Sequence, residues 1–191
     1  MGCHGGFSVD EATRRSWFNP EKILADTGLR PGMVFIDIGS GDGFFTMLAA
    51  RLVGENGLVY AVDTDGSAIE RLKRKATQDR LNNVKAVVSE AEESILCEGC
   101  ADIIFYSIAL HDFHNPLKVL HNAKQMLKSS GTLVDLDWKK EHMSFGPPEQ
   151  IRFSEDTASK LMVTAGFEIM NVSDAGSYHY VITAKPSELT I

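Results

Sequence analysis

Residues 33–43 constrain the fold more strongly than any other stretch of this chain. A nearly continuous apolar run, Met33–Ile38, leads into the glycine-rich segment Gly39–Gly43, and a helix-favouring segment, Phe44–Val53, follows directly. An uninterrupted apolar run is typical of a strand that is buried on both faces, as in a parallel sheet. Glycines at the following turn allow positive φ and a close approach of the backbone to a ligand. This stretch therefore predicts a parallel α/β sheet with a ligand-binding loop at the end of its first strand.

The rest of the chain continues the alternation of apolar strands and amphipathic helices. It predicts strands at Leu58–Val62, Val84–Val88, Ala101–Ile108 and Thr132–Asp137, and helices at Asn19–Thr27, Ser67–Arg80 and Pro116–Leu127. The tail adds a helix that begins at Ser154 and stops at Gly166, then strands at Phe167–Val172 and Tyr178–Ala184 with a hairpin-length gap between them. Alternating strands and helices indicate right-handed crossovers. We therefore expect a doubly wound α/β sheet with helices on both faces, ending in an antiparallel hairpin.

Length and composition favour one globular domain and exclude several classes of protein. The chain has 191 residues, of which 43% are hydrophobic and 24% charged, and its formal net charge is −7. An acidic chain lacks the clustered cations that bind phosphates, so a nucleic-acid partner is not expected. No apolar run approaches the roughly 18–20 residues of a membrane span, and the first ten residues lack the pattern of a signal peptide. Because the chain has three cysteines, an odd number, we expect a reduced, cytoplasmic protein rather than a disulfide framework.

Asp63 ends the second predicted strand and lies 20 residues after Gly43. In a βαβ unit, an acid at this place can accept hydrogen bonds from both hydroxyls of a ribose. The glycines do not match the G-x-G-x-x-G loop that binds the pyrophosphate of a dinucleotide, because Phe44 stands at the third glycine position. Asp37 and Asp42 would also repel a pyrophosphate. A cofactor with an ammonium group and no phosphate, S-adenosylmethionine, suits this loop better, and a nicotinamide-dependent oxidoreductase is the alternative enzyme.

Further motifs resemble those of the class I S-adenosylmethionine-dependent methyltransferases, in particular the small type 11 members, over about residues 19–185. Motif-like segments are Asp37–Gly43, Val59–Asp63, Asn83–Glu92, Ala101–Pro116, Met126–Leu133 (with Ser129 and Ser130 in place of the family's Pro-Gly) and Ala165–Phe167. The resemblance implies one methyltransferase domain over residues 1–191, with an N-terminal helical segment or lid at 1–30 and a catalytic core at 31–185. It also implies a Rossmann-like sheet of seven strands in the order 3-2-1-4-5-7-6, with strand 7 antiparallel. A protein that keeps this fold and binds S-adenosylmethionine without catalysis is the alternative from another class.

The resemblance assigns cofactor contacts residue by residue. The glycine loop would hold the methionine end, acids after the second and third strands would hold the ribose and the adenine, and residues after the fourth strand would form the wall under the sulfonium. The predicted cofactor-binding residues are Asp37, Gly39, Ser40, Gly41, Gly43, Asp63, Thr64, Glu90, Ala91, Ser107 and Ile108. These motifs leave the methyl acceptor unidentified, although the lack of an inserted substrate domain favours a small molecule. The sequence predicts no metal site and does not specify an oligomeric state.

Three candidate catalytic residues follow the fourth and fifth predicted strands: His111, Asp112 and Asp137. Ligands bind at the carboxyl ends of the strands in such sheets. Methyl transfer depends mainly on positioning, and a base is needed only where the acceptor must lose a proton. Histidine titrates near neutral pH and suits that role, although His111 could instead only cap the strand end. Asp135, inside the fifth strand, must be paired, hydrogen-bonded or protonated if it is buried; we expect a structural partner, with an acceptor-orienting role as the alternative.

Several further features are predicted to be structural or to lie over the site. Cys97 and Cys100 form a CxxC that precedes a strand instead of opening a helix, so we expect neither a redox motif nor a zinc site there. Trp138 could wall the pocket or simply cover the end of the sheet, and Trp17 could form a hydrophobic staple or part of a lid over the cofactor. The segment Glu141–Arg152 is long for a loop in a compact domain and could act as a lid over the acceptor.

Overall fold

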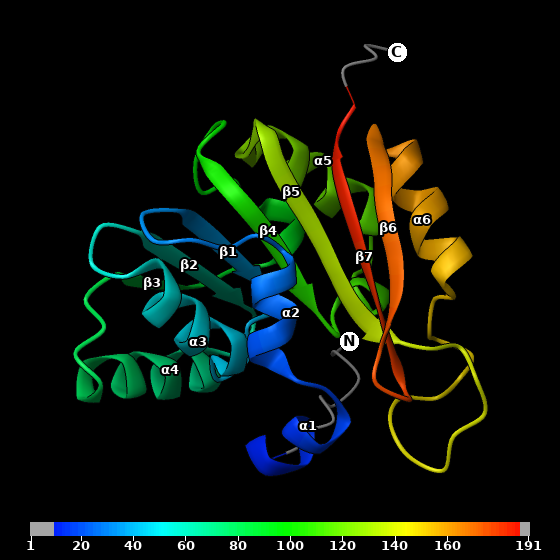
Figure 1. Cartoon of the computed structure of the whole chain (residues 1–191), viewed down its shortest axis with the longest axis horizontal. Helices are drawn as coiled ribbons and strands as arrows, with labels where there is room; N and C mark the ends of the chain where they lie inside the picture. Colours follow the sequence, from blue (N-terminus) through cyan, green and yellow to red (C-terminus); the bar gives the residue numbers. More distant parts are fainter. Residues whose placement is uncertain (1–9, 188–191) are drawn as a thin grey trace.

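Seven strands form one mixed sheet in the order β3-β2-β1-β4-β5-β7-β6 in the computed structural model, which describes residues 10–187 (Figure 1). The strands are β1 (Val34–Ile38), β2 (Leu58–Asp63), β3 (Val84–Val88), β4 (Ala101–Ser107), β5 (Leu127–Trp138), β6 (Phe167–Ala175) and β7 (His179–Pro186). The first five strands pair in parallel, whereas β7 is antiparallel to both β5 and β6. The predicted strand order, the Rossmann-like class and the antiparallel strand are all confirmed.

Helices cover both faces of the sheet (Figure 1). They are α1 (Glu11–Trp17), α2 (Pro20–Asp26), α3 (Phe44–Val53), α4 (Gly66–Gln78), α5 (Pro116–Met126) and α6 (Glu155–Thr164), with short 3₁₀ turns η1 (Ala91–Glu93) and η2 (Leu110–Asp112). Side-chain caps set several of their starts, as the sequence predicts: Asn19, Asn115 and Ser154 each accept a hydrogen bond from a backbone N–H of the first turn. Pro20 and Pro116 occupy first helical positions, where a missing N–H costs nothing.

Alternation along the central strands divides the core into two layers. In β1, Phe35 packs with α2 and α3, whereas Ile36 and Ile38 pack on the opposite face with α5 and α6. The same alternation on β5 places Val134 on the first face and Leu133 on the second. A polar side chain on one of these strands is therefore buried in the same layer as the apolar side chain two positions away on that strand.

The structure differs from the sequence prediction most clearly at the start of β5 and in an additional helix, α1. Strand β5 begins at Leu127 rather than Thr132, because Ser129 and Ser130 replace the Pro-Gly that would break the strand, and their backbone N–H groups stay available for pairing. Helix α1 was not predicted, since its short sequence EATRRSW has no apolar stripe and none of its residues is buried. It forms behind an N-cap, Asp10, whose side chain accepts from the N–H of Thr13.

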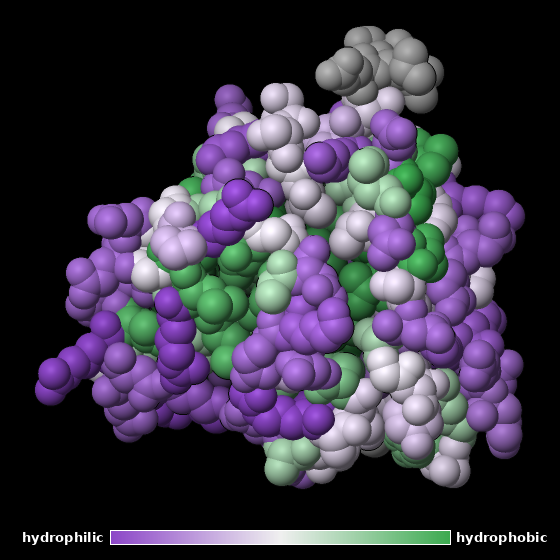
Figure 2. All heavy atoms as spheres, in the orientation of Figure 1, coloured by the Kyte–Doolittle hydropathy of each residue, from purple (hydrophilic) through white to green (hydrophobic). Residues whose placement is uncertain are grey.

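The surface seen in Figure 2 is largely hydrophilic over α1 and α2 and more apolar toward β6 and α6. The exposed apolar side chains on that side include Val163, Met170 and Val172. Strand β6 is an edge of the sheet, and edge strands are commonly left with one uncovered face. Among residues 10–187, no helix has both the length and the apolar character that crossing a membrane requires.

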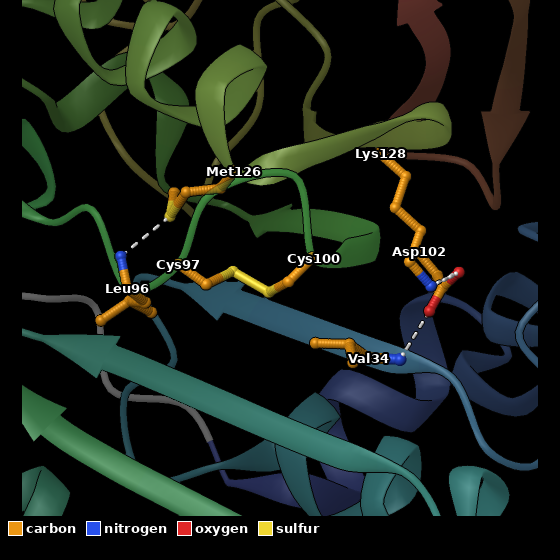
Figure 3. Close-up of a disulfide and its surroundings, with 7 residues drawn as sticks. All are labelled: Val34, Leu96, Cys97, Cys100, Asp102, Met126 and Lys128. Carbon is orange, nitrogen blue, oxygen red and sulfur yellow. Dashed lines mark hydrogen bonds and ion pairs between the residues drawn. A yellow bond between two sulfur atoms is a disulfide. The ribbon is translucent and has the colours of Figure 1, made fainter.

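Cys97 and Cys100 are joined by a disulfide, shown in Figure 3, so the prediction of reduced cysteines was wrong. The loop between η1 and β4 is held against the end of α5, where the N–H of Gly99 donates to the carbonyl of Gln125 (2.9 Å) and that of Cys100 to Met126 (3.0 Å). The two cysteine Cα atoms are consequently 6.0 Å apart, within the usual range for a disulfide. This loop precedes β4 and therefore lies at the amino end of that strand.

Candidate active site

A cavity of about 300 Å³ opens at the carboxyl ends of β1, β4 and β5. The sequence predicted a ligand site at this edge of the sheet. The cavity is lined by Arg14, Trp17, Asp37, Gly39, Ser40, Gly41, Phe44, Phe45, Ser107, Ile108, His111, Asp112, Trp138, Gly146, Pro147, Pro148 and Ile151. The structure thus brings together eight of the predicted residues: Asp37, Gly39, Ser40, Gly41, Ser107, Ile108, His111 and Asp112.

The glycine loop uses its own N–H groups inside the protein. Gly39 and Ser40 both donate to the carbonyl of Val62 (2.8 and 3.0 Å), and Gly41 donates to the Oδ2 atom of Asp63 (2.7 Å). Gly39 and Gly41 have positive φ, and a Cβ on Gly39 would lie 2.6 Å from that of Ala109. Since these amides are already engaged, the loop is poorly suited to a phosphate, whose binding depends on free N–H groups.

Polar atoms without partners face this part of the cavity. Asp37 is 1% exposed; its Oδ2 atom accepts from the hydroxyl of Thr46 (2.6 Å), whereas its Oδ1 atom and the buried Oγ atom of Ser40 make no hydrogen bond within the described residues. Burial raises the pKa of Asp37 to about 7, and the charge of Asp63 contributes in the same direction. A ligand ammonium would supply both a donor and the missing counter-charge. The residues therefore fit the methionine end of S-adenosylmethionine.

The other predicted cofactor residues do not line the cavity. Asp63 is partly buried, and its Oδ1 atom accepts from the N–H of Asp65 (2.8 Å) in addition to the bond from Gly41. Thr64 and Glu90 are exposed, and Ala91 is buried at the start of η1. Gly43 has a packing role of its own: it has positive φ, and a Cβ there would overlap the side chain of Leu72 on α4.

Ile108 has a left-handed backbone conformation, with φ of 57°. Such a conformation is strained for a β-branched residue and persists only where the surroundings hold it. The N–H of Ile108 donates to the carbonyl of Leu136 (2.7 Å), which fixes the turn after β4. The strained turn presents Ser107 and Ile108 to the cavity. Backbone strain of this kind is concentrated at functional sites, so it supports a functional role for the turn.

His111 and Asp137 form a buried pair at the floor of the cavity. The Nδ1 atom of His111 is 2.8 Å from the Oδ2 atom of Asp137, and the Oδ1 atom of Asp137 accepts from the N–H of Trp138 (2.7 Å). Asp112 approaches the other ring nitrogen, Nε2, at 3.5 Å. Burial alone would lower the pKa of His111, but the hydrogen bond and charge of Asp137, helped by Asp112, raise it overall. His111 and Asp112 line the cavity, whereas Asp137 lies behind His111 as its partner.

Asp135 lies on the same face of β5 as Asp137 and is completely buried. It interacts with the hydroxyl of Tyr180 on the neighbouring strand β7, although neither of its oxygens makes a hydrogen bond of ordinary geometry. Burial, and then the charge of Asp137, raise its pKa well above the usual aspartate range. A tyrosine neighbour agrees with the structural interpretation of Asp135, and Asp135 does not line the cavity.

Aromatic rings and a long loop close the remaining side of the cavity. Trp17 contacts Trp138 (5.0 Å between ring centres) and Phe145 (5.9 Å), so α1 meets the loop that follows β5. Arg152, 2% exposed, ties that loop down by donating to the carbonyls of Pro147 (2.8 Å from Nε), Lys139, Glu141 and Phe145. The two tryptophans and the loop thus form walls, as the sequence allowed.

Three lining residues were not anticipated from the sequence: Arg14, Phe44 and Phe45. Arg14 is carried by the helix that had no apolar pattern, and its position depends on how α1 packs. Phe44 and Phe45 have the pattern of ordinary core residues at the start of α3, whereas Ile151 belongs to the loop that was expected as a lid. Only the proximity of the Phe44–Val53 helix to the glycine loop could have indicated Phe45.

Comparisons with known proteins place this chain among methyltransferase domains. A methyltransferase domain family matches residues 29–174. A crystal structure of a SAM-dependent methyltransferase from Aquifex aeolicus is 33% identical, with a TM-score of 0.87 over 92% of this chain and 93% of that one. A probable cobalt-precorrin-6B C(15)-methyltransferase (decarboxylating) from Sulfurisphaera tokodaii is 42% identical over 112 residues, 58% of this chain and 56% of that protein. A ubiquinone/menaquinone biosynthesis C-methyltransferase from Vibrio cholerae is 29% identical over 162 residues, 81% of this chain and 58% of that protein.

The chain belongs to this family of S-adenosylmethionine-dependent methyltransferase domains. The resemblance predicted from the sequence is therefore confirmed, and the nicotinamide alternative is not supported. The chain spans somewhat more than half the length of the curated relatives it matches.

Proposed function

We propose that this chain transfers a methyl group from S-adenosylmethionine to a small-molecule acceptor, and that His111 removes a proton from the acceptor. One observation carries the proposal: the His111–Asp137 pair (2.8 Å) faces the same cavity as the glycine loop and the buried, half-paired Asp37. When bound, S-adenosylmethionine supplies a methyl group that its sulfonium has already activated. The chain's own residues then need to bind the cofactor, align the acceptor with the methyl group and remove a proton from the acceptor.

The cofactor contacts follow from the geometry of the loop. We propose that Asp37 and Ser40 bind the ammonium end beside Gly39 and Gly41, and that Asp63 accepts from the ribose hydroxyls. Each oxygen of Asp63 has one lone pair engaged by the backbone and a second one available. The further proposed contacts are Thr64, Glu90 and Ala91 for the adenine, and Ser107 with Ile108 for the wall at the sulfonium. Gly43 acts through helix packing.

His111 is placed to act as a base. Its Nδ1–H donates to Asp137, which fixes the tautomer and leaves the lone pair of Nε2 toward the cavity. Asp137 is a positioning residue that orients the ring and stabilises the imidazolium after proton transfer. Asp112, close to Nε2, would then accept a hydrogen bond from the protonated ring. The acceptor is accordingly a molecule whose nucleophilic atom carries a dissociable proton.

The dimensions of the cavity favour a small acceptor. Its volume of about 300 Å³ is at the lower end for ligand pockets. Trp17, Trp138 and Pro147 give the acceptor side an apolar character. We further propose that the whole chain is one catalytic domain, with the segment before residue 31 as part of the acceptor wall. A cytoplasmic location remains a prediction, and the disulfide removes the argument for it that reduced cysteines had provided.

Binding and turnover test the proposal separately. Calorimetry should show affinity for S-adenosylmethionine and S-adenosylhomocysteine and none for NAD. Asp63→Ala should weaken both affinities by about 1–3 kcal/mol, because it leaves polar groups unpaired. Glu168→Ala, an exposed acid on the edge strand β6 at the other side of the sheet, is the control and should leave both affinities unchanged. Unchanged affinity in Asp63→Ala would remove the ribose assignment.

Turnover is measured as formation of S-adenosylhomocysteine in the presence of fractionated small molecules. His111→Gln should bind S-adenosylhomocysteine normally and lose about 10²–10⁴-fold in turnover, the usual contribution of a general base. Cofactor binding without turnover of any small-molecule fraction would favour the noncatalytic alternative. A His111→Gln variant with full turnover would show that positioning alone is sufficient.

A further inference from the structure

Arg14 places a positive charge in the wall of the cavity. It lies in the middle of α1 and lines the cavity together with Asp37 and Ser40. Its guanidinium carbon is 5.4 Å from the centre of the Phe44 ring, a second lining side chain. The aromatic contact fixes the stem of Arg14 over the start of α3, next to the glycine loop.

The charge of Arg14 has no ion-pair partner among residues 10–187, unlike that of its neighbour Arg15. Arg15 donates to Glu11 (2.9 Å) and to Glu21 (2.7 Å) on the outside of the molecule. The nearest acid of the loop, Asp42, is itself bound by Lys75 (2.7 Å). Among the described residues that line the cavity, Arg14 is the one arginine or lysine, and no ion pair engages its guanidinium donors.

We propose that Arg14 binds the carboxylate of the methionine end of S-adenosylmethionine while Asp37 binds the ammonium. The inference rests on the proposed function and extends it to a residue that the glycine motif does not contain. A free amino-acid end carries one positive and one negative charge on adjacent groups, and Asp37 and Arg14 present the opposite pair from β1 and α1. Guanidinium donors match a carboxylate in a bidentate geometry, which a lysine cannot reproduce.

Helix α1 thereby becomes part of the cofactor site as well as of the acceptor wall. Trp17 follows Arg14 by three residues and lies near it on the helix surface. Its ring packs on Trp138 at 5.0 Å, on the acceptor side of the cavity. Occupation of Arg14 by a carboxylate should therefore hold α1, and with it the Trp17 wall, in place.

Three adenosyl ligands with different amino-acid ends test the inference by calorimetry, each ligand being compared between wild type and variant. S-adenosylhomocysteine has both charged groups, decarboxylated S-adenosylmethionine lacks the carboxylate, and 5′-methylthioadenosine lacks both groups. Arg14→Gln should weaken S-adenosylhomocysteine binding about 10–100-fold, as expected for a charge-assisted bond, and leave the other two ligands within about twofold. Arg14→Lys should give an intermediate loss. Arg15→Gln, the matched control on the same helix, should change none of the three affinities.

Amide hydrogen exchange gives a second measurement, whose expected ligand-specific change a general loss of stability would not produce. S-adenosylhomocysteine should slow amide exchange across residues 11–17 in the wild type, and 5′-methylthioadenosine should not. An equal loss for all three ligands in Arg14→Gln, or no loss for any, would overturn the inference while leaving the proposed function intact. Failure of the wild type to bind any of the three ligands would instead overturn the proposed function.

Discussion

The substitution Asp37→Asn tests separately how much stability the buried carboxylate costs and how much it contributes to cofactor binding. In the protein without ligand, Asp37 is 1% exposed and one of its oxygens has no hydrogen-bond partner. An asparagine oxygen can still accept the bond from the hydroxyl of Thr46 but carries no charge. We therefore expect the variant to be more stable than the wild type and to bind the cofactor poorly.

The magnitude follows from the pKa of Asp37. It is about 7 in the folded protein, against an ordinary aspartate value of 3.8 in the unfolded chain. A raised pKa means that the folded state binds more protons, so the stability contributed by Asp37 is fully present below pH 3.8 and is lost as the pH rises through 7. Linkage gives a loss of about 2 kcal/mol at pH 5 and about 4 kcal/mol at pH 8. Since asparagine does not titrate, the advantage of the variant should grow by about 2–3 kcal/mol between these two pH values.

Urea denaturation at both pH values, without ligand, measures this difference. The control is Asp42→Asn in the same loop. The pKa of Asp42 is lowered: burial opposes the shift, but the hydrogen bond and charge of Lys75 outweigh it. That carboxylate therefore stabilises the fold above pH 3.8, so its variant should lose stability at pH 8, the opposite sign to Asp37→Asn. Calorimetry with S-adenosylhomocysteine completes the comparison, because only Asp37→Asn should abolish binding.

Two results would refute the reasoning. If Asp37→Asn raised the free energy of unfolding equally at pH 5 and pH 8, ionisation of the Asp37 carboxylate would not be what destabilises the folded state. If the folded variant still bound S-adenosylhomocysteine, the charge of Asp37 would not be needed to bind the ligand ammonium.

Three further predictions concern the base, the loop and the disulfide. The wild-type kcat/KM should rise with pH through a pKa above the ordinary histidine value, because Asp137 stabilises the charged ring of His111, and Asp137→Asn should move that limb to lower pH; a flat profile from pH 5.5 to 9 would contradict this. Arg152→Met should cost about 2–4 kcal/mol in urea denaturation and weaken acceptor binding, since it leaves several loop carbonyls unpaired; an equal loss of S-adenosylhomocysteine affinity would contradict its placement in the acceptor wall. Thiol titration of unreduced, denatured protein should find one free thiol among the three cysteines, and reduction of Cys97–Cys100 should cost about 2 kcal/mol; three free thiols before reduction would contradict the pairing.

The sheet was predictable because its signals are local. Apolar runs identified each strand; the predicted strand Val84–Val88 and the predicted helix Phe44–Val53 had the observed bounds. The acid at Asp63 was also placed correctly at the end of β2, where it holds Gly41 rather than pointing into solvent. Strand order came from the family resemblance, since pairing between distant strands leaves no local trace in one sequence.

The acceptor side was predictable only in outline, as a long loop at Glu141–Arg152 and an N-terminal segment that could each act as a lid. Its walls come from α1 and from the loop after β5, which are far apart in the chain and have no periodic pattern, so no local signal shows that they meet. Helix α1 buries none of its residues, yet Arg14 and Trp17 on it reach the cavity. The disulfide depends on how the end of α5 holds the loop at Gly99, and the spacing of the two cysteines gave no indication of it.

Asp135 shows how the buried charges of β5 are arranged. Asp135 and Asp137 lie two residues apart on one face, and both are removed from water. Two close carboxylates cannot both ionise cheaply in such surroundings, and only Asp137 has His111 within hydrogen-bond distance. Burial, and then the charge of Asp137, raise the pKa of Asp135, which favours a proton on the carboxyl group beside Tyr180. Of the two acids of this strand, Asp137 is thus the one placed to orient His111, and its hydrogen bond and charge raise the pKa of that ring.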